Sequence, residues 1–504
     1  MKIVNSVFSW IIKKRIHQME LFMKHPIDVQ TELFLNLIDT AKNTEWGRRY
    51  DYKSIKTYQD YKNRVPLQDY GSLKDQIIRI KHGEQNVLWP TDIKWFAKSS
   101  GTSTGKNKFI PVSKESLIDC HYKGGKDLLS IYHNNHPESK LILGKVLVVG
   151  GSSAINSFSN NSYYGDLSAI IMKNFPMWVE HRRVPKMDIA IMDDWEEKIE
   201  KMALSTTQEN VSNISGVPSW TLVLMKRILE INKTDNILDI WPNLELFMHG
   251  GVNFSPYKEQ FKKIAPGNQL NYYENYNATE GFFGLQDQSK VEEMLLMLDY
   301  GIFYEFIEQS EIHNEAPKTI TLEGVELHKN YALVISTNAG LWRYVIGDTV
   351  MFTSLSPFRI KITGRINQFI NAFGEELIID NAETALLNTC KKTASIIKEY
   401  TVAPKFFTNK STGKHQWLIE FEKSPENIEY FSEVLDEELK ALNSDYEAKR
   451  VNNLVLDQPE INKLASGTFY QWMKVNNKLG GQHKIPRLSN HSKYVEELLS
   501  LVQF

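Results

Sequence analysis

The sequence predicts an α/β fold: a large N-terminal domain of layered α/β sheets with a β-barrel-like part, then a small α+β C-terminal domain. Runs that are apolar on both faces end in Gly-Gly at residues 141–151 and 244–251, as buried strands of such sheets do. Helical patterns at 186–204 and 218–232 lie between these strands. With 504 residues, 42% of them hydrophobic and 24% charged, the chain is long enough for two to four ordinary globular domains.

The first 90 residues show helical patterns. Apolar residues recur at helical spacing from Val4 to Met23, and the interrupting Lys13, Lys14 and Arg15 argue against a signal peptide. Such a basic amphipathic helix can lie on a membrane, but we favour one that packs on its own domain. No run of about 18–20 apolar residues predicts a membrane span.

The rest of the chain follows in order. Residues 92–99 and 109–112 are typical of strands, with Ser113 as the N-cap of the next helix. A β-rich region at 297–363 indicates a barrel or second sheet, and a linker follows Arg365. Beyond the linker we expect a helix from near Asp380, a strand at HQWLIEFEK, a helix at 427–443, a strand at GTFYQWMKV and a helix at 491–503. These patterns predict domains at 1–365 and 381–504, joined by a hinge at 366–380.

Composition excludes several classes of protein. Lys and Arg number 59 against 61 Asp and Glu, so no general basic face for nucleic acid is expected. The two cysteines, Cys120 and Cys390, cannot form a Cys-based zinc site, and their scarcity fits a cytoplasmic protein. The sequence contains no H-E-x-x-H, G-x-S-x-G or G-x-G-x-x-G motif.

The strongest chemical signal is SSGTSTGKNKFIP, which starts at Ser99. Glycines let backbone N–H groups converge on phosphate oxygens, while Ser and Thr hydroxyls and Lys106 or Lys108 add donors. The spacing from Gly101 to Gly105 is one residue too short for a Walker A loop, and Asn107 replaces its hydroxyl. The segment therefore predicts phosphate binding, with a solvated loop as the alternative.

Two further signals are acidic residues near strand ends. In YNATEG, Tyr276 can stack on a base, and Thr279 and Glu280 suit a phosphate oxygen and Mg²⁺. In YVIGDTV, Asp348 suits two sugar hydroxyls. In isolation YNATEG is a weak signal, and an exposed glutamate beside a turn explains it better. For Asp348, a turn aspartate bonded to its own backbone is an equal alternative.

The last two signals are TGRINQFINAFGEE, which Arg365 opens, and KVNNKLGGQHKIPR near the C-terminus. A lysine on a Gly-rich loop of a small terminal domain can reach the cleft of another domain. The alternative is a solvated basic surface.

The order of these five motifs resembles the adenylate-forming superfamily, and within it the auxin-responsive Gretchen Hagen three family of acyl acid amido synthetases. The resemblance implies ATP, Mg²⁺, a carboxylic acid and an amino acid, and a mobile C-terminal domain that rotates between two half-reactions. It also implies roles for single residues. The phosphate loop would comprise Ser99, Ser100, Gly101, Thr102, Ser103, Gly105 and Lys108. Tyr276 would cover adenine, Thr279 would contact a phosphate group and Glu280 would bind Mg²⁺. Asp348 would bind the ribose hydroxyls, with Arg365 as its partner at the hinge. Lys484 would act in adenylation, with Lys478 as the alternative.

Some expectations stay open. Asn367 replaces the Asp or Lys often found at the hinge, and Gly374, Glu375 and Glu376 stand where some members carry a lysine. We expect a substrate pocket wall from Trp220, His249, Gly250 and Gly251. A thiol (acyl-CoA) ligase and a non-catalytic nucleotide-binding protein are the alternatives to an amido synthetase, and the protein is expected to be a monomer or a simple homo-oligomer. The acid, the amino acid and the base for the amine are not identified by the sequence.

Overall fold

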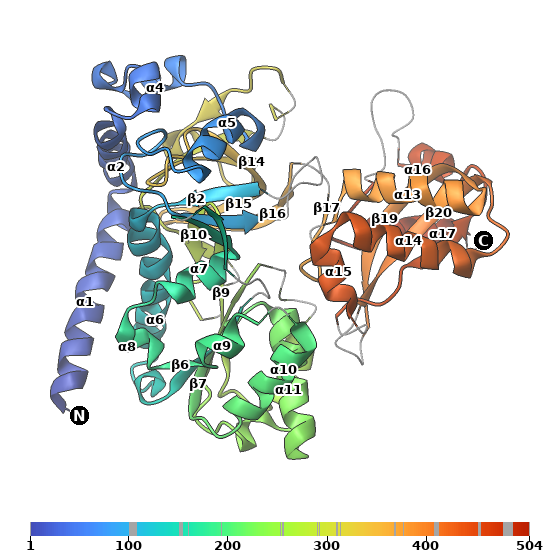
Figure 1. Ribbon diagram of the computed structural model, residues 1–504, viewed down its shortest axis with the longest axis horizontal. Coiled ribbons are helices and arrows are strands. Elements are labelled where there is room, and N and C mark those ends of the chain that lie inside the picture. Colours follow the sequence, from blue (N-terminus) through green and yellow to red (C-terminus); the bar gives the residue numbers. More distant parts are fainter. Residues whose placement is uncertain are drawn as a thin grey trace.

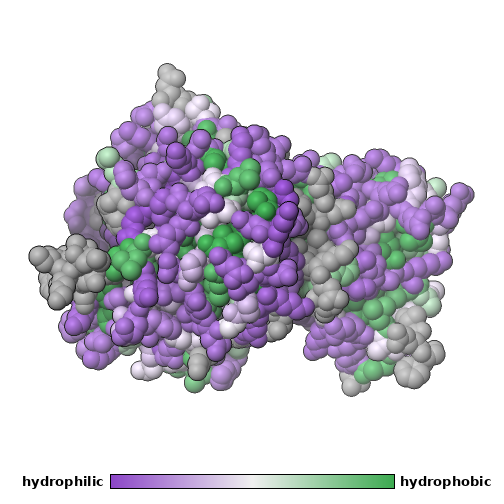
Figure 2. Space-filling view, turned by 90° about the horizontal axis from the view of Figure 1, so that it is seen from below, coloured by the Kyte–Doolittle hydropathy of each residue, from purple (hydrophilic) through white to green (hydrophobic). Residues whose placement is uncertain are grey.

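In the computed structural model the chain has an α/β fold with a separate C-terminal part, as expected (Figure 1). The structure describes residues 2–99, 108–150, 155–159, 161–192, 194–251, 254, 257–289, 291, 293–308, 311–312, 314–366, 369–375, 377–407, 413–451, 455–476 and 487–502. In Figure 2 the C-terminal part forms the smaller lobe of a mainly hydrophilic surface. Among the described residues, no helix combines the length and the apolar character that crossing a membrane requires.

Helices form the N-terminal region, as the sequence predicts. They are α1 (Lys2–Lys24), α2 (Pro26–Ala41), α3 (Glu45–Arg49), the 3₁₀ turn η1 (Tyr52–Ser54), α4 (Tyr58–Arg64) and α5 (Tyr70–Lys81). From residue 12 onward α1 packs on the protein itself, because Ile12 and Met19 are buried. Arg15 of α1 also forms ion pairs with Asp127 and Asp299, both at 2.6 Å. The membrane-surface interpretation is therefore not needed for this part of the helix.

A twelve-stranded sheet, in the order β13-β12-β14-β15-β16-β11-β10-β9-β8-β7-β3-β6, forms the centre of the large part. Its parallel strands are β3 (Lys145–Val149), β6 (Arg183–Val184), β7 (Val211–Gly216), β8 (Leu246–Gly250) and β9 (Asn271–Ala278). The antiparallel strands are β10 (Gly281–Leu285), β11 (Met294–Leu296), β12 (Ile302–Glu308), β13 (Thr319–Ile320), β14 (Asn330–Thr337), β15 (Tyr344–Leu355) and β16 (Phe358–Arg365). Because β11 pairs with β16, the β-rich region continues the parallel sheet and does not form a sheet of its own.

A second sheet of four strands carries the predicted phosphate loop. Its order is β2-β1-β5-β4, from β1 (Trp95–Ser99), β2 (Lys108–Val112), β4 (Asn156–Ser159) and β5 (Ser162–Gly165). Strands β1 and β2 pair antiparallel, with Ser99 opposite Lys108, so the two ends of the loop lie side by side. The Ser113 hydroxyl accepts a hydrogen bond from the Ser116 amide at 2.9 Å, which confirms the predicted cap.

The remaining helices of the large part cover these sheets. They are η2 (Ser116–Tyr122), which is a π-helix, α6 (Lys123–Asn135), α7 (Leu167–Lys173), α8 (Met177–Glu180), α9 (Met187–Ala190), α10 (Trp195–Thr206), α11 (Pro218–Asn232) and α12 (Lys258–Ile264), with 3₁₀ turns η3 (Leu141–Leu143), η4 (Ile237–Asp239) and η5 (Leu322–Gly324). The predicted helix at 218–232 is confirmed at both ends. The pattern at 186–204 is divided between α9 and α10.

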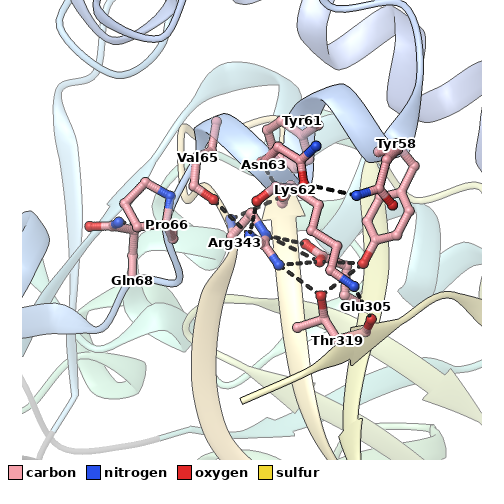
Figure 3. A network of polar contacts seen from close by, with 12 residues as sticks. Tyr58, Tyr61, Lys62, Asn63, Val65, Pro66, Gln68, Glu305, Thr319 and Arg343 are labelled. Atoms are coloured by element: carbon pink, nitrogen blue, oxygen red, sulfur yellow. Dashed lines mark hydrogen bonds and ion pairs between the residues drawn. The ribbon is translucent and has the colours of Figure 1, made fainter. Parts of the chain in front are cut away.

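A buried polar network joins the N-terminal helices to the sheet (Figure 3). Arg343 lies 2.9 Å from Glu305, and both side chains are almost fully enclosed. Arg343 also donates to the carbonyl of Val65 at 2.6 Å, and Tyr58 donates to Glu305 at 2.9 Å. Since each charge has several partners, the network holds α4 and the chain after it against β12 and β15.

The C-terminal part has its own three-stranded sheet, in the order β19-β20-β21. Its elements are β17 (Phe369–Ile370), β18 (Leu377–Ile378), α13 (Ile379–Thr393), β19 (Ile396–Phe406), β20 (Gly413–Lys423), α14 (Ile428–Leu442), α15 (Ser444–Arg450), β21 (Glu460–Leu464), α16 (Thr468–Val475) and α17 (Lys493–Val502). The helix near Asp380, the strand HQWLIEFEK and the last two predicted helices agree with this arrangement.

The predicted strand at GTFYQWMKV is wrong, because residues 468–475 form helix α16. Phe469 and Trp472 are both buried, and their spacing of three residues fits one face of a helix. The Trp472 indole donates to Glu497 of α17 at 2.8 Å. The aromatic content favoured a strand, whereas contacts with α17 stabilise the helix.

Candidate active site

The candidate site lies at the carboxyl edge of the parallel strands. Strands β7, β8 and β9 run in the same direction, so their ends at Gly216, Gly250 and Ala278 meet along one edge. Ligands of open α/β sheets bind at this edge. A Cβ atom on Gly250 would lie 2.4 Å from the carbonyl oxygen of Asn275, so only glycine permits this close approach of the strands.

Tyr276 and Asp348 come from two separate motifs, and the structure brings them together. The Tyr276 hydroxyl donates to Asp348 Oδ2 at 2.6 Å, and both residues are buried. Asp348 follows Gly347, whose φ of +100° is one that glycine adopts readily. Asp348 lies opposite Arg365 in the β15–β16 ladder, so the backbone also places the predicted hinge partner beside it.

Thr279 and Glu280 form the turn between β9 and β10. The Thr279 hydroxyl donates to Glu280 Oε2 at 2.5 Å, and both residues are half-buried. The described residues contain no group of three His, Cys, Asp or Glu side chains that could hold a metal ion. A single carboxylate still fits Mg²⁺, which usually takes one or two protein carboxylates and completes its shell with phosphate oxygens and water.

His249 is a buried, uncharged group at the end of β8. Burial lowers the pKa of its imidazole to about 3, so the ring is neutral at physiological pH. The ring stacks on Phe254 with a centroid distance of 4.1 Å, and Nδ1 has no hydrogen-bond partner among the described residues. Gly250 and Gly251 follow directly, and Gly251 has a φ of +81°.

Trp220 lies at the same edge, in the first turn of α11. Its ring contacts the C-terminal part, because Lys449 Nζ lies 3.6 Å from the ring centroid. Trp220 thus stands at the junction of the two parts of the molecule, and its role in a substrate pocket stays a prediction.

The motifs did not indicate His121, which the structure places close to these residues. His121 lies on the π-helix η2, and its Nδ1 is 3.1 Å from Asn277 Oδ1, two residues before Thr279. Burial lowers the pKa of this imidazole to about 4. The only signal available in the sequence was its position in the helix that directly follows the loop and β2. The structure adds that this helix is a π-helix, a conformation that is frequent at functional sites.

Several predicted residues lie outside the described residues. They are Ser100, Gly101, Thr102, Ser103, Gly105, Lys478 and Lys484. Of the phosphate loop, Ser99 and Lys108 are described, at the facing ends of β1 and β2. The Arg365 backbone ends β16.

The chain that follows Lys484 is connected to the carboxyl edge of the sheet. Leu488 pairs with Val402 of β19, which fixes this segment to the C-terminal sheet. Asn490 Oδ1 accepts a hydrogen bond from the Asn371 amide at 2.7 Å, and Asn371 Nδ2 donates to the carbonyl of Gly251 at 3.3 Å. Two hydrogen bonds, both through Asn371, therefore connect the chain after the lysine segment to Gly251 at the end of β8.

Glu375, one of the residues of the predicted hinge segment, is enclosed within the C-terminal part. Its Oε1 lies 2.8 Å from His415 Nε2, and its Oε2 accepts from the Phe373 amide at 2.7 Å. Both Glu375 and His415 are fully buried. This carboxylate consequently acts within the C-terminal part and is not oriented toward a phosphate group.

Family models match three consecutive parts of the chain. The GH3 family N-terminal domain matches residues 15–270, the central domain residues 295–365 and the C-terminal domain residues 380–493. Indole-3-acetic acid-amido synthetase GH3.3 of Arabidopsis thaliana is 24% identical over 94% of this chain and 91% of its own length. Jasmonoyl–L-amino acid synthetase JAR6 of Nicotiana attenuata is 22% identical over 67% of this chain and 68% of its own.

Solved structures show the same fold. GH3.15 acyl acid amido synthetase has a TM-score of 0.61 and 17% identity, and the match covers 96% of this chain and 95% of that one. A 2-hydroxyisobutyryl-CoA ligase has a TM-score of 0.56 and 12% identity, over 95% and 93% of the two chains. The three family models follow one another along the chain and together match most of its residues, so the chain is a member of the GH3 family.

Proposed function

We propose that this protein is an ATP-dependent acyl acid amido synthetase. In the first step a substrate carboxylate oxygen bonds to the α-phosphorus of ATP, and pyrophosphate leaves. In the second step the neutral amine of an amino acid bonds to the acyl carbon, the amine loses a proton, and AMP leaves. The observation that carries this proposal is the pairing of Tyr276 with Asp348 beside Thr279 and Glu280, in a chain of the GH3 family.

Asp348 and Tyr276 would bind the nucleoside. A carboxylate accepts hydrogen bonds from two ribose hydroxyls, as acidic residues do in dinucleotide sites. The Tyr276 ring would cover adenine, while its hydroxyl orients the Asp348 carboxylate. Arg365, opposite Asp348 in the ladder, would support this contact from the start of the hinge.

The phosphate groups of ATP would lie between the loop that joins β1 to β2 and the turn that joins β9 to β10. We assign them to Ser99, Lys108 and the intervening loop, with Thr279 on the other side and Glu280 as the ligand of Mg²⁺. When bound, Mg²⁺ neutralises phosphate charge and so permits the approach of a carboxylate. Each well-placed donor to the developing charge typically contributes about 2–4 kcal/mol.

Lys484 would assist adenylation, with Lys478 as the alternative. We propose that the C-terminal domain, residues 381–504, rotates on a hinge at 366–380 and so removes this lysine before the amine enters. The link from Asn490 through Asn371 to Gly251 supports the approach of this segment to the site.

His249, Gly250, Gly251 and Trp220 would form the wall of the substrate pocket, and His121 adds a polar group from η2. Both histidines are neutral because burial lowers their pKa values, so they can bind polar groups of an acid without adding charge. No base for the amine is assigned.

A thiol ligase is the second candidate, because the fold is shared with a CoA ligase. Pyrophosphate release should therefore be measured with a panel of carboxylic acids, each alone, with mixed amino acids and with CoA. Stimulation by amino acids, with an N-acyl amino acid found by mass spectrometry, supports the synthetase. Stimulation by CoA alone contradicts it, and bound ATP without release by any acid favours a non-catalytic binding protein.

A further inference from the structure

The two parts of the molecule meet at a lysine placed over an indole ring. Lys449 Nζ lies 3.6 Å from the centre of the Trp220 ring. Lys449 is only 3% exposed, which is rare for a lysine unless its charge has a specific partner. In Figure 1, α15 is the helix of the C-terminal part nearest α10 and α11.

Each side of this contact is rigidly held. The neighbours of Lys449 on α15 both bind Asp436, Tyr446 at 2.7 Å and Arg450 at 2.5 Å. Trp220 is in the first turn of α11, which begins at Pro218 directly after β7. The lysine and the indole are thus fixed separately, one in each part, and meet only when the parts are docked as here.

A second set of contacts lies close to the connection between the parts. Tyr257 donates to the carbonyl of Ala372 at 2.9 Å, and Asn371 donates to the carbonyl of Gly251 at 3.3 Å. Residues 371 and 372 follow the end of β16 closely, so a rotation about the hinge displaces them little. Lys449 lies near the far end of α15, whose N-cap Asn443 donates to the carbonyl of Glu375 at 2.9 Å. Lys449 therefore turns with the C-terminal part, and the same rotation separates it from Trp220.

We propose that Lys449 and Trp220 are positioning residues, which hold the C-terminal part in one of the two arrangements needed for the reaction. This inference rests on the proposed function, in which two half-reactions use different arrangements. A cation over an indole is bound more strongly when it is desolvated, and rotation would return the ammonium group to water. The contact therefore favours one half-reaction over the other.

The test compares the two half-reactions in Lys449→Met, Trp220→Leu and the double variant. Adenylation is followed by pyrophosphate release, and acyl transfer by amide formation from supplied acyl-adenylate. We expect the ratio of the two rates to change about tenfold, with the double variant no worse than either single variant. Lys449→Arg should restore the ratio, and Lys392→Met, an exposed lysine of the same domain paired with Glu438, should leave it unchanged.

A second measurement does not depend on turnover. Energy transfer between dyes on Glu230→Cys of α11 and Glu437→Cys of α14, both exposed positions, reports how far apart the two parts are. Lys449→Met should lower the docked fraction in the protein without substrates, while its melting temperature stays near that of the parent. An unchanged docked fraction, or equal losses in both half-reactions, would overturn the proposal. A protein that adenylates no acid but loses docking in Lys449→Met would contradict the proposed function and leave the contact established.

Discussion

The hydroxyl of Tyr276 lies 2.6 Å from the carboxylate of Asp348, so a strand of the parallel half of the sheet is joined to a strand of the antiparallel half. The two residues lie far apart in the sequence, so the residues around each of them do not predict the contact. The contact defines one carboxylate, oriented from one side by a phenol, at the edge where ligands of such sheets bind.

Replacement of Asp348 should impair nucleotide binding. Asp348→Ala removes the acceptor that we propose for ribose hydroxyls. Hydrogen bonds to charged groups contribute about 1.5–3 kcal/mol, so the KM for ATP should rise about 10- to 100-fold. Steady-state kinetics and calorimetric titration with ATP check this. Tyr276→Phe retains the ring and loses the hydroxyl, so a smaller rise is expected. Unchanged ATP affinity in Asp348→Ala would remove the ribose assignment.

Glu280→Gln should weaken the use of Mg²⁺. The amide keeps the shape of the carboxylate but loses its charge, so pyrophosphate release should fall about 10²–10³-fold at low Mg²⁺. A titration with MgCl₂ should show partial recovery at high concentration. Thr279→Val removes the 2.5 Å hydrogen bond and the proposed phosphate contact but keeps the charge of Glu280, so its Mg²⁺ dependence should stay near that of the parent protein. An identical Mg²⁺ dependence in the parent protein and Glu280→Gln would contradict the metal assignment.

Lys484→Ala should reduce adenylation much more than amide formation from supplied acyl-adenylate, because its proposed role is to offset the charge that accumulates on phosphate. Lys478→Ala serves as the comparison. If Lys478→Ala shows the selective loss instead, the adenylation lysine is Lys478, and equal losses in both steps would exclude Lys484 from its proposed role.

Arg343→Met should destabilise the protein strongly. It leaves the buried Glu305 carboxylate without its ion-pair partner, and such losses typically destabilise by about 3–5 kcal/mol. Urea unfolding measures the change, and the double variant Arg343→Met, Glu305→Leu should recover part of it. A fall in the free energy of unfolding below about 1 kcal/mol, typical of surface ion pairs, would show that the network in Figure 3 contributes little to stability.

His249 should make stability depend on pH. Its pKa is lowered to about 3 in the folded protein by burial, so between this value and the ordinary value of 6.5 the unfolded chain binds more protons. The free energy of unfolding should therefore fall as the pH falls, by about 2 kcal/mol from this residue between pH 7 and pH 5. Urea unfolding of the parent and of His249→Phe at both pH values measures the difference. Parallel losses in the two proteins would contradict the lowered pKa.

Short sequence patterns were sufficient to predict several helices and strands. Helix α11 begins at Pro218 because proline suits the first helical turn, and apolar periodicity defines the rest. Strands β1 and β2 followed from short apolar runs on either side of a Gly-rich loop. Helix α16 was missed because its aromatic residues also suit a strand, and only its contacts with α17 decide between the two.

Non-local pairing was beyond such patterns. The hydrogen bonds between β11 and β16 make one sheet of what the sequence indicated as two regions, and nothing in either strand specifies its neighbour. The contact of Trp220 with Lys449 likewise depends on how the two parts of the molecule meet. The site motifs were identified through a resemblance in their order, whereas the contact of Tyr276 with Asp348 required the fold.

The β15–β16 hairpin places Asp348 directly opposite Arg365, and the chain leaves the large part just after that residue. The carboxylate proposed to clamp ribose and the point about which the small domain would turn thus occupy a single rung of one ladder. If the small domain turns as proposed, its movement would reach the proposed nucleoside contact through this one pair of backbone neighbours. Binding of a nucleotide and the angle of the small domain would then be mechanically coupled, with no relay of side chains between them.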